Sequence, residues 1–255
     1  MRIYIDAFRT QKAGNTEAEY EDAFWSRDQS SVILPGQTVR IAVADGATDA
    51  VFSGLWARLL VKAYGRRHMT GETVADHLVR AARVWDRVVK RHSLPWYAEE
   101  KARNGTYAAL LGLELTQTAN GASGTWSALS CGDCCFFHLR SSELLRAFPV
   151  DRAACFSNSP VLFGSHPETR GLEGLVTAAG DWQEGDCFYL MSDALALWFI
   201  TCCEQGLVPA QILRDVTLAK EPGFDEWIAG LRQQRAIKND DCTLVALSFN
   251  YCREL

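Results

Sequence analysis

The chain has 255 residues, of which 48% are apolar, so it can bury a sizeable core, and we expect one domain over residues 1–255. Its 26 basic and 31 acidic residues give a net charge of −5 with no long run of either sign, which argues against nucleic acid as a partner. The first ten residues carry charges and no apolar run is long enough to span a bilayer. We therefore expect a cytoplasmic protein with no membrane partner.

Apolar periodicity and turn residues predict an ordered series of elements along the chain. They are strands within residues 1–45 with a loop at 11–20 and a turn at 35–36, helices at 52–63 and 72–91, strands at 107–115, 125–131, 134–139 and 143–148, an irregular segment at 151–180, a strand at 187–191 followed by a helix, helices at 209–218 and 224–234, and a strand at 243–249. Asp49 is the expected N-cap of the first helix, and Pro95 is expected to end the second. This order predicts packed sheets with helices over their outer faces.

Nine cysteines occur in this chain, and an odd number without an export signal is typical of reduced thiols. Cys131 and Cys134 have the C-x-x-C spacing of a redox pair or half a zinc site, with Cys135 beside them. No second pair or nearby His pair completes four ligands. Packed core thiols are therefore the favoured interpretation.

Acidic residues stand at the ends of several apolar runs. Asp45 and Asp193 each follow such a run, and the pair Asp240-Asp241 precedes one. Carboxylates at the rim of an apolar sheet repel one another and lose hydration unless they share something positive. Taken singly, these acids are also explained as a turn, a helix cap and an exposed loop.

A divalent cation would satisfy such a group of carboxylates. Ligands that are all oxygen favour Mg or Mn over zinc or copper. Two ions sharing a carboxylate would polarise a phosphoryl oxygen and supply a bridging hydroxide for in-line attack on phosphorus. The chain has no G-x-S-x-G elbow and no G-x-x-x-x-G-K-[ST] loop, so those competing chemistries lack their sequence marker.

The order of the motifs carries a family resemblance over about residues 12–249. The motifs are Glu21-Asp22-Ala23, Val43-Ala44-Asp45-Gly46, Gly105-Thr106, Cys131-Gly132-Asp133, Ser192-Asp193 and Asp240-Asp241-Cys242-Thr243. In this order they resemble the motifs of the metal-dependent protein phosphatases of type 2C. The resemblance implies an α+β fold of four αββα layers, with two central antiparallel sheets between helix pairs. It also implies two Mn or Mg ions and hydrolysis of phosphoserine or phosphothreonine.

The resemblance further implies a role for each motif residue. Asp45 would bridge both metals, Gly46 would lend its carbonyl, Asp193 and Asp240 would hold the first metal, Asp22 the second, Glu21 would act through water, and Asp133 would help to hold a third, weaker ion. Residues 155–180 correspond to the family's mobile flap beside the cleft, where substrate selection is expected.

The chain also departs from the family pattern. The family's D-G-x-G-G continues here as Asp45-Gly46-Ala47-Thr48-Asp49, so the two glycines after the metal-binding turn are missing. Ala194 replaces a glycine, and Asp241 stands where Asn is usual. The phosphate-binding Arg is absent at its usual spacing, and Lys12 is the expected substitute, as a point charge, unless it is only an exposed lysine. His166 is a candidate general acid, but a surface His is the favoured interpretation.

These observations lead to a primary hypothesis and two alternatives. The primary hypothesis is a cytoplasmic, monomeric serine/threonine protein phosphatase of signalling, with Asp45, Asp193 and Lys12 as catalytic residues and a phosphorylated protein as substrate. One alternative is a non-catalytic relative that binds phosphoproteins, motivated by the lost glycines and the missing Arg. The other keeps catalysis but changes the substrate to a small phosphate ester.

Overall fold

The computed structural model describes residues 2–26, 30–32, 36–48, 50–119, 121–157, 159–218 and 223–249. The strands in these residues are β1 (Arg2–Thr10), β2 (Ala23–Ser26), β3 (Ser30–Val32), β4 (Thr38–Gly46), β5 (Tyr107–Gln117), β6 (Ser123–Cys131), β7 (Cys135–Arg140), β8 (Glu143–Phe148), β9 (Phe163–Gly164), β10 (Val176–Gln183), β11 (Asp186–Met191) and β12 (Cys242–Phe249). The helices are α1 (Ser53–Arg67), α2 (Val74–Val89), α3 (Trp96–Arg103), α4 (Asp193–Glu204), α5 (Pro209–Leu218) and α6 (Phe224–Gln233).

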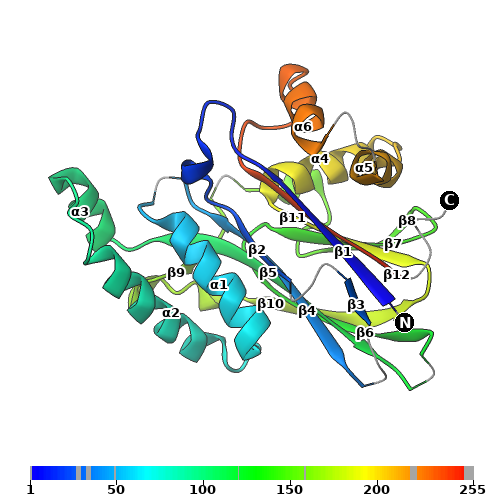
Figure 1. Ribbon diagram of the computed structural model, residues 1–255, viewed down its shortest axis with the longest axis horizontal. Helices are drawn as coiled ribbons and strands as arrows, with labels where there is room; N and C mark the ends of the chain where they lie inside the picture. The colour runs from blue at the N-terminus through cyan, green and yellow to red at the C-terminus, as the bar shows by residue number, and fades with distance from the viewer. Residues whose placement is uncertain are drawn as a thin grey trace.

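The strands form two antiparallel sheets that pack face to face (Figure 1). The first sheet has the order β3-β1-β12-β11-β7-β8. The second has the order β10-β6-β5-β4-β2, with β9 paired to β5. Neighbours in each sheet include strands that are far apart in sequence, such as β1 and β12, so the two ends of the chain meet in the first sheet.

The central strands are buried on both faces, which explains their nearly continuous apolar sequence. In β12, Val245 and Leu247 face the core between the sheets, whereas Leu244 faces the helices on the outside. In β4, Val43 faces the same central core, and Ala44 faces the opposite helix layer. The period of two therefore gives each of these strands a separate contact with both neighbouring layers.

Helices cover the outer face of each sheet. Helices α1 and α2 pack on the second sheet, and α4, α5 and α6 pack on the first (Figure 1). The arrangement is the four-layer αββα sandwich that the family resemblance implied. Within the described residues, no helix combines the length and the apolar character needed to cross a bilayer.

Most predicted elements are confirmed, but several local predictions were wrong. The first helix begins at Ser53 with Phe52 as its N-cap, in the left-handed conformation at φ 59°, and Asp49 lies outside the described residues. Pro95 does not end the second helix, which stops at Val89, but is the N-cap of α3. The segment 151–180 contains the start of β10, a strand whose largely exposed residues conceal it from an apolar pattern. Of the predicted turn at 35–36, Pro35 also lies outside the described residues.

Strand register brings the acidic segments to one edge of the sandwich. Met191 of β11 pairs with Cys135 of β7 on one side and with Leu244 of β12 on the other. Asp133 lies two residues before Cys135, Asp193 follows Met191 by two, and the 240–241 pair precedes Leu244. The chain reversals that carry these acids therefore leave the first sheet at the same edge.

Candidate metal centre and cleft

A cleft of about 530 Å³ opens at this edge, between the ends of the two sheets. Six of the predicted site residues line it: Lys12, Asp45, Gly46, Asp133, Asp193 and Asp240. Two further predicted ligands, Glu21 and Asp22, are not among the lining residues. The charge of Asp240 nevertheless acts on Glu21, and the charge of Asp22 acts on Asp45. The structure thus brings the sequence-predicted acids together from separate segments of the chain.

Asp45 is held at the end of β4, where it pairs with Ala109 of β5. Burial raises the pKa of its carboxyl well above the ordinary value, and the charges of Asp22 and Asp193 raise it further. The next position, 46, has no room for a side chain larger than that of glycine. A Cβ at this position would lie 2.8 Å from the backbone carbon of Ser53 and 2.9 Å from the carbonyl oxygen of Glu21.

Asp22 is almost fully buried, and a chain of hydroxyl groups orients it. The Thr243 hydroxyl donates to Asp22 Oδ2 at 2.7 Å, so the Tyr20 hydroxyl, which is bonded to the same Thr243 oxygen, must donate to it. The backbone N–H of Thr243 donates to Ser192 Oγ at 3.0 Å. Neither Thr243 nor Ser192 was predicted as a site residue, because neither is itself an acid or a base.

The second oxygen of Asp22, Oδ1, is buried and has no hydrogen-bond partner among the described residues. Burial raises the pKa of this carboxyl, and the charges of Asp241 and Asp193 add to the rise, whereas the hydroxyl groups of Thr243 and Ser192 oppose it. A buried carboxylate oxygen without a donor is costly. This atom is therefore a structural indication that a positive ligand belongs beside it.

Glu21 accepts a hydrogen bond from the Ser53 hydroxyl at the start of α1. Burial raises the pKa of Glu21 to about 7, the Ser53 bond opposes the rise, and the charges of Asp241 and Asp240 add to it. Since Gly46 packs against the same two residues, the end of β4, the Glu21 segment and the start of α1 are fixed together.

Asp133 lies in the tight reversal between β6 and β7. Gly132 before it adopts φ 101°, and a Cβ there would lie 2.5 Å from the Cβ of Ala109, so only glycine fits. Burial raises the pKa of Asp133 to about 6, and the charge of Asp193 adds to the effect. The neighbouring thiols of Cys134 and Cys135 are buried and unpaired, and burial raises their pKa. This confirms them as core thiols.

Both carboxylate oxygens of Asp241 accept backbone N–H groups, and this fastens the loop that carries Lys12. Its Oδ1 accepts the backbone N–H of Lys12 at 2.7 Å, and its Oδ2 accepts the backbone N–H of Glu21 at 2.7 Å. Asn239 exchanges two hydrogen bonds with the backbone of Ala13, at 2.8 and 3.3 Å. Lys12 is therefore presented to the cleft by a backbone that is bound at several points.

Lys238 is a site residue that the sequence analysis missed. Its Nζ lies 2.7 Å from Asp240 Oδ2 and 3.5 Å from Asp193 Oδ2, and it lines the cleft with them. Burial lowers the pKa of Lys238, but its bonds and charges with these two acids outweigh that effect and raise it. The signal for this residue was its position two places before Asp240.

The acids fit a pair of hard divalent cations by chemistry and by burial. Their donor atoms are all oxygen, and Asp22 Oδ1 lacks a partner. Within the described residues, however, no three His, Cys, Asp or Glu side chains are already arranged as a cation site. Glu21, Asp22 and Asp193 are turned instead toward Ser53, Thr243 and Lys238. Rotation of these side chains is needed before they can share an ion.

The segment after β8 forms one wall of the cleft. Phe156, Ser157, Pro160 and Leu162 line it, in agreement with the position predicted for the flap. His166 is exposed and is not among the lining residues, and Gly105 packs against its ring. The alternative interpretation of His166 as a surface residue is thus the better one.

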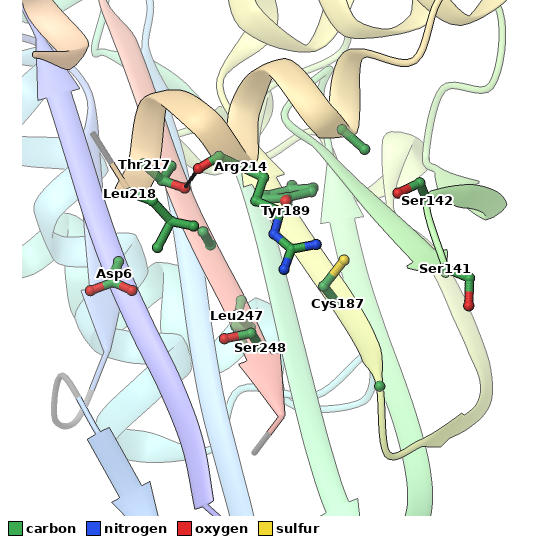
Figure 2. Close-up of a pocket in the computed structure, with 13 residues that line it drawn as sticks. Asp6, Ser141, Ser142, Cys187, Tyr189, Arg214, Thr217, Leu218, Leu247 and Ser248 are labelled. Carbon is green, nitrogen blue, oxygen red and sulfur yellow. Dashed lines mark hydrogen bonds between the residues drawn. The ribbon is translucent and has the colours of Figure 1, made fainter. Parts of the chain in front are cut away.

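A second cavity, of about 110 Å³, lies between α5 and the outer face of the first sheet. Figure 2 shows Arg214 and Leu218 pointing from α5 toward the strands, with Asp6 at the edge on β1. Asp6 is the one carboxylate among the residues that line this cavity. This second cavity therefore lacks the group of converging acids that distinguishes the cleft.

Comparison with known proteins gives a result only at the level of structure. No protein-family model matches the chain, and no curated protein matches its sequence. The S. agalactiae serine/threonine phosphatase is 12% identical with a TM-score of 0.57, and the match covers 97% of this chain and 100% of that one. The photosystem II phosphatase PBCP is 14% identical with a TM-score of 0.56, covering 97% and 99%.

A third solved structure is described with its metal. The catalytic domain of the serine/threonine protein phosphatase PstP, in complex with 2 manganese ions, is 16% identical with a TM-score of 0.52, covering 97% of this chain and 98% of that one. The chain has the fold of the type 2C phosphatases. The likeness extends over nearly the whole chain and, at these identities, concerns the fold.

Proposed function

We propose that this protein is a phosphatase that removes phosphate from serine or threonine side chains of a phosphorylated protein, with Mn or Mg bound by the cleft acids. The observation that carries the proposal is the convergence of Asp22, Asp45, Asp133 and Asp193: burial and the charge of Asp193 raise the pKa of the other three. A group of buried, mutually repelling acids is unfavourable in a scaffold with no function for it. Bound divalent ions would polarise the phosphoryl group and activate a water.

Each residue of the chain has a defined task in this proposal. Asp45, with the carbonyl of Gly46, would hold cations at the end of β4, and Asp193 and Asp240 would hold one from the opposite wall. Asp22 would use its unpartnered Oδ1, while Thr243 keeps Oδ2 in place. Glu21 would contact a metal ion through a water molecule, and Asp133 would help to hold a third, weaker ion.

Lys12 would bind the phosphate of the substrate as a single positive charge. It lines the same cleft as the carboxylates, on a loop whose Lys12 backbone N–H donates to Asp241. An ammonium contacts phosphate as a point charge and lacks the two-pronged geometry of a guanidinium. Substrate binding is therefore expected to depend strongly on salt concentration.

The test replaces Asp193 and uses an exposed aspartate as the control. Asp193→Asn should reduce the hydrolysis of para-nitrophenyl phosphate and of phosphopeptides by at least about 100-fold, because several kcal/mol of transition-state stabilisation depend on the cation. Asp181→Asn, at an exposed position of β10, should retain wild-type rates. All activity should require added Mn or Mg. Wild-type turnover by Asp193→Asn would refute the ligand assignment.

A second candidate function is a phosphoprotein-binding module without turnover. The observation that favours it is the ammonium of Lys238, which already neutralises Asp193 and Asp240 without an ion. Binding and phosphate release measured on a panel of phosphopeptides separate the two candidates. The same assay on phosphorylated metabolites tests whether the substrate is instead a small phosphate ester. Binding of phosphopeptides with no release of phosphate at any cation concentration would support the module.

A further inference from the structure

Lys238 stands where its charge meets two acids of the cleft at once. Its Nζ is 2.7 Å from Asp240 Oδ2 and 3.5 Å from Asp193 Oδ2. These two acids come from different elements, the start of α4 and the loop before β12, and their side chains are 21% and 19% exposed. The motif order assigns this same pair to one cation, so the ammonium and that cation would need the same oxygens.

The two positive groups cannot occupy this place together. A divalent ion contacts carboxylate oxygens directly, and at that distance it would also repel the ammonium. The backbone around Lys238 cannot move aside easily, since Asn239 is bonded to Ala13 and the carbonyl of Asp240 accepts a bond from Arg232 at 2.6 Å. The side chain is 60% exposed and has a flexible four-carbon stem, so it is the part able to leave.

We propose that Lys238 is a tethered cation that occupies the Asp193 and Asp240 side of the cleft until a divalent ion displaces it. Lys238 then sets the affinity for that ion, because each binding event must first break its ion pairs. This inference rests on the proposed function only in that the same acids bind the metal. It also explains why these acids are not arranged as a cation site in the described residues.

The experiment measures the binding of Mn²⁺ by titration calorimetry, independently of activity. Lys238→Met keeps an unbranched side chain only one atom shorter and removes the charge, and Lys238→Arg keeps a charge. Lys12→Met is the matched control, because it removes the same charge from the same cleft while its side chain makes no ion pair with Asp193 or Asp240 in the described structure. We expect Lys238→Met to bind Mn²⁺ about tenfold more tightly, Lys12→Met to change affinity by less than about threefold, and Lys238→Arg to stay near wild type.

Each outcome decides the inference. Equal gains in Lys238→Met and Lys12→Met would mean that only the net charge of the cleft matters, and the tethered-cation proposal would be wrong. Unchanged or weaker binding in Lys238→Met would also overturn it. If no variant binds Mn²⁺, both this inference and the metal-dependent function fail. If Lys238→Met binds more tightly but no variant releases phosphate, the inference stands and the phosphatase function fails.

Discussion

Replacing Asp133 by asparagine should stabilise the metal-free protein at alkaline pH. The folded protein raises the pKa of this carboxyl from 3.8 to about 6, first through burial and then through the charge of Asp193. Since one pKa unit corresponds to about 1.4 kcal/mol, keeping Asp133 ionised in the folded state costs up to about 3 kcal/mol at pH 8. The residue is only 9% exposed, so solvent screening reduces this cost little.

The sign of the pH effect follows from which state holds the proton. Because the folded pKa is the higher one, the unfolded chain loses its proton first as the pH rises above about 4. The wild type therefore loses stability between about pH 4 and pH 6, and the neutral amide of the variant does not. Burying the amide has its own cost, so we expect a net gain of about 1–2 kcal/mol at pH 8 and no gain near pH 4.

Urea unfolding followed by tryptophan fluorescence, with a chelator present, measures the free energy of unfolding of wild type and of Asp133→Asn at each pH. Repeating the urea unfolding with Mn²⁺ adds a second comparison. Bound cations would neutralise the repulsion between Asp133 and Asp193, so the stability gained by Asp133→Asn should shrink. A variant that is less stable than wild type at pH 8 without cations would refute the reasoning. An advantage that Mn²⁺ leaves unchanged would show that no bound ion acts on Asp133.

Two further predictions concern packing and buried charge. Gly46→Ala should destabilise the fold by about 2 kcal/mol or more and abolish phosphatase activity, because its Cβ would lie 2.8 Å from the backbone of Ser53; unchanged unfolding in urea would contradict this. Asp186→Ala should cost about 3 kcal/mol, since the fully buried carboxylate binds His138 at 2.8 Å and Arg140 at 2.7 Å. Burial opposes the ionisation of Asp186, but these bonds hold its pKa below the ordinary value. The stability difference between wild type and Asp186→Ala should therefore shrink as the pH falls below about 4. Urea unfolding of both proteins over a series of acidic pH values would test this.

The sequence was sufficient for the layers of the fold because the central strands are buried on both faces. Strands such as β4 and β12 appear as short apolar runs bounded by turns, and that signal is local. Helix α3 and strand β10 were missed because each is largely exposed, which leaves no apolar period to detect. The cap at Phe52 was missed because a left-handed phenylalanine has no sequence signal.

The site was predictable as a set of acids but not as a set of contacts. Asp45 and Asp193 were identified from their positions at strand ends, and the cleft brings them together. Lys238 was missed because its partner Asp193 is 45 residues away, and the pairing depends on the register of β11 with β12. Thr243 was missed because its importance lies in the hydrogen bond to Asp22, and a hydroxyl at a strand start is common.

The loop before β12 carries two side chains of opposite charge, Asp241 and Lys238, that act on the cleft in opposite directions. Asp241, in place of the usual Asn, adds a carboxylate that raises the pKa of both Glu21 and Asp22. Its two oxygens accept the backbone N–H groups of Lys12 and Glu21, whereas an amide has only one oxygen with which to accept them. Lys238 adds a positive charge in the same loop and offsets this repulsion at Asp193 and Asp240. Removing the lysine should therefore make the acids more available to a cation and the metal-free fold less stable.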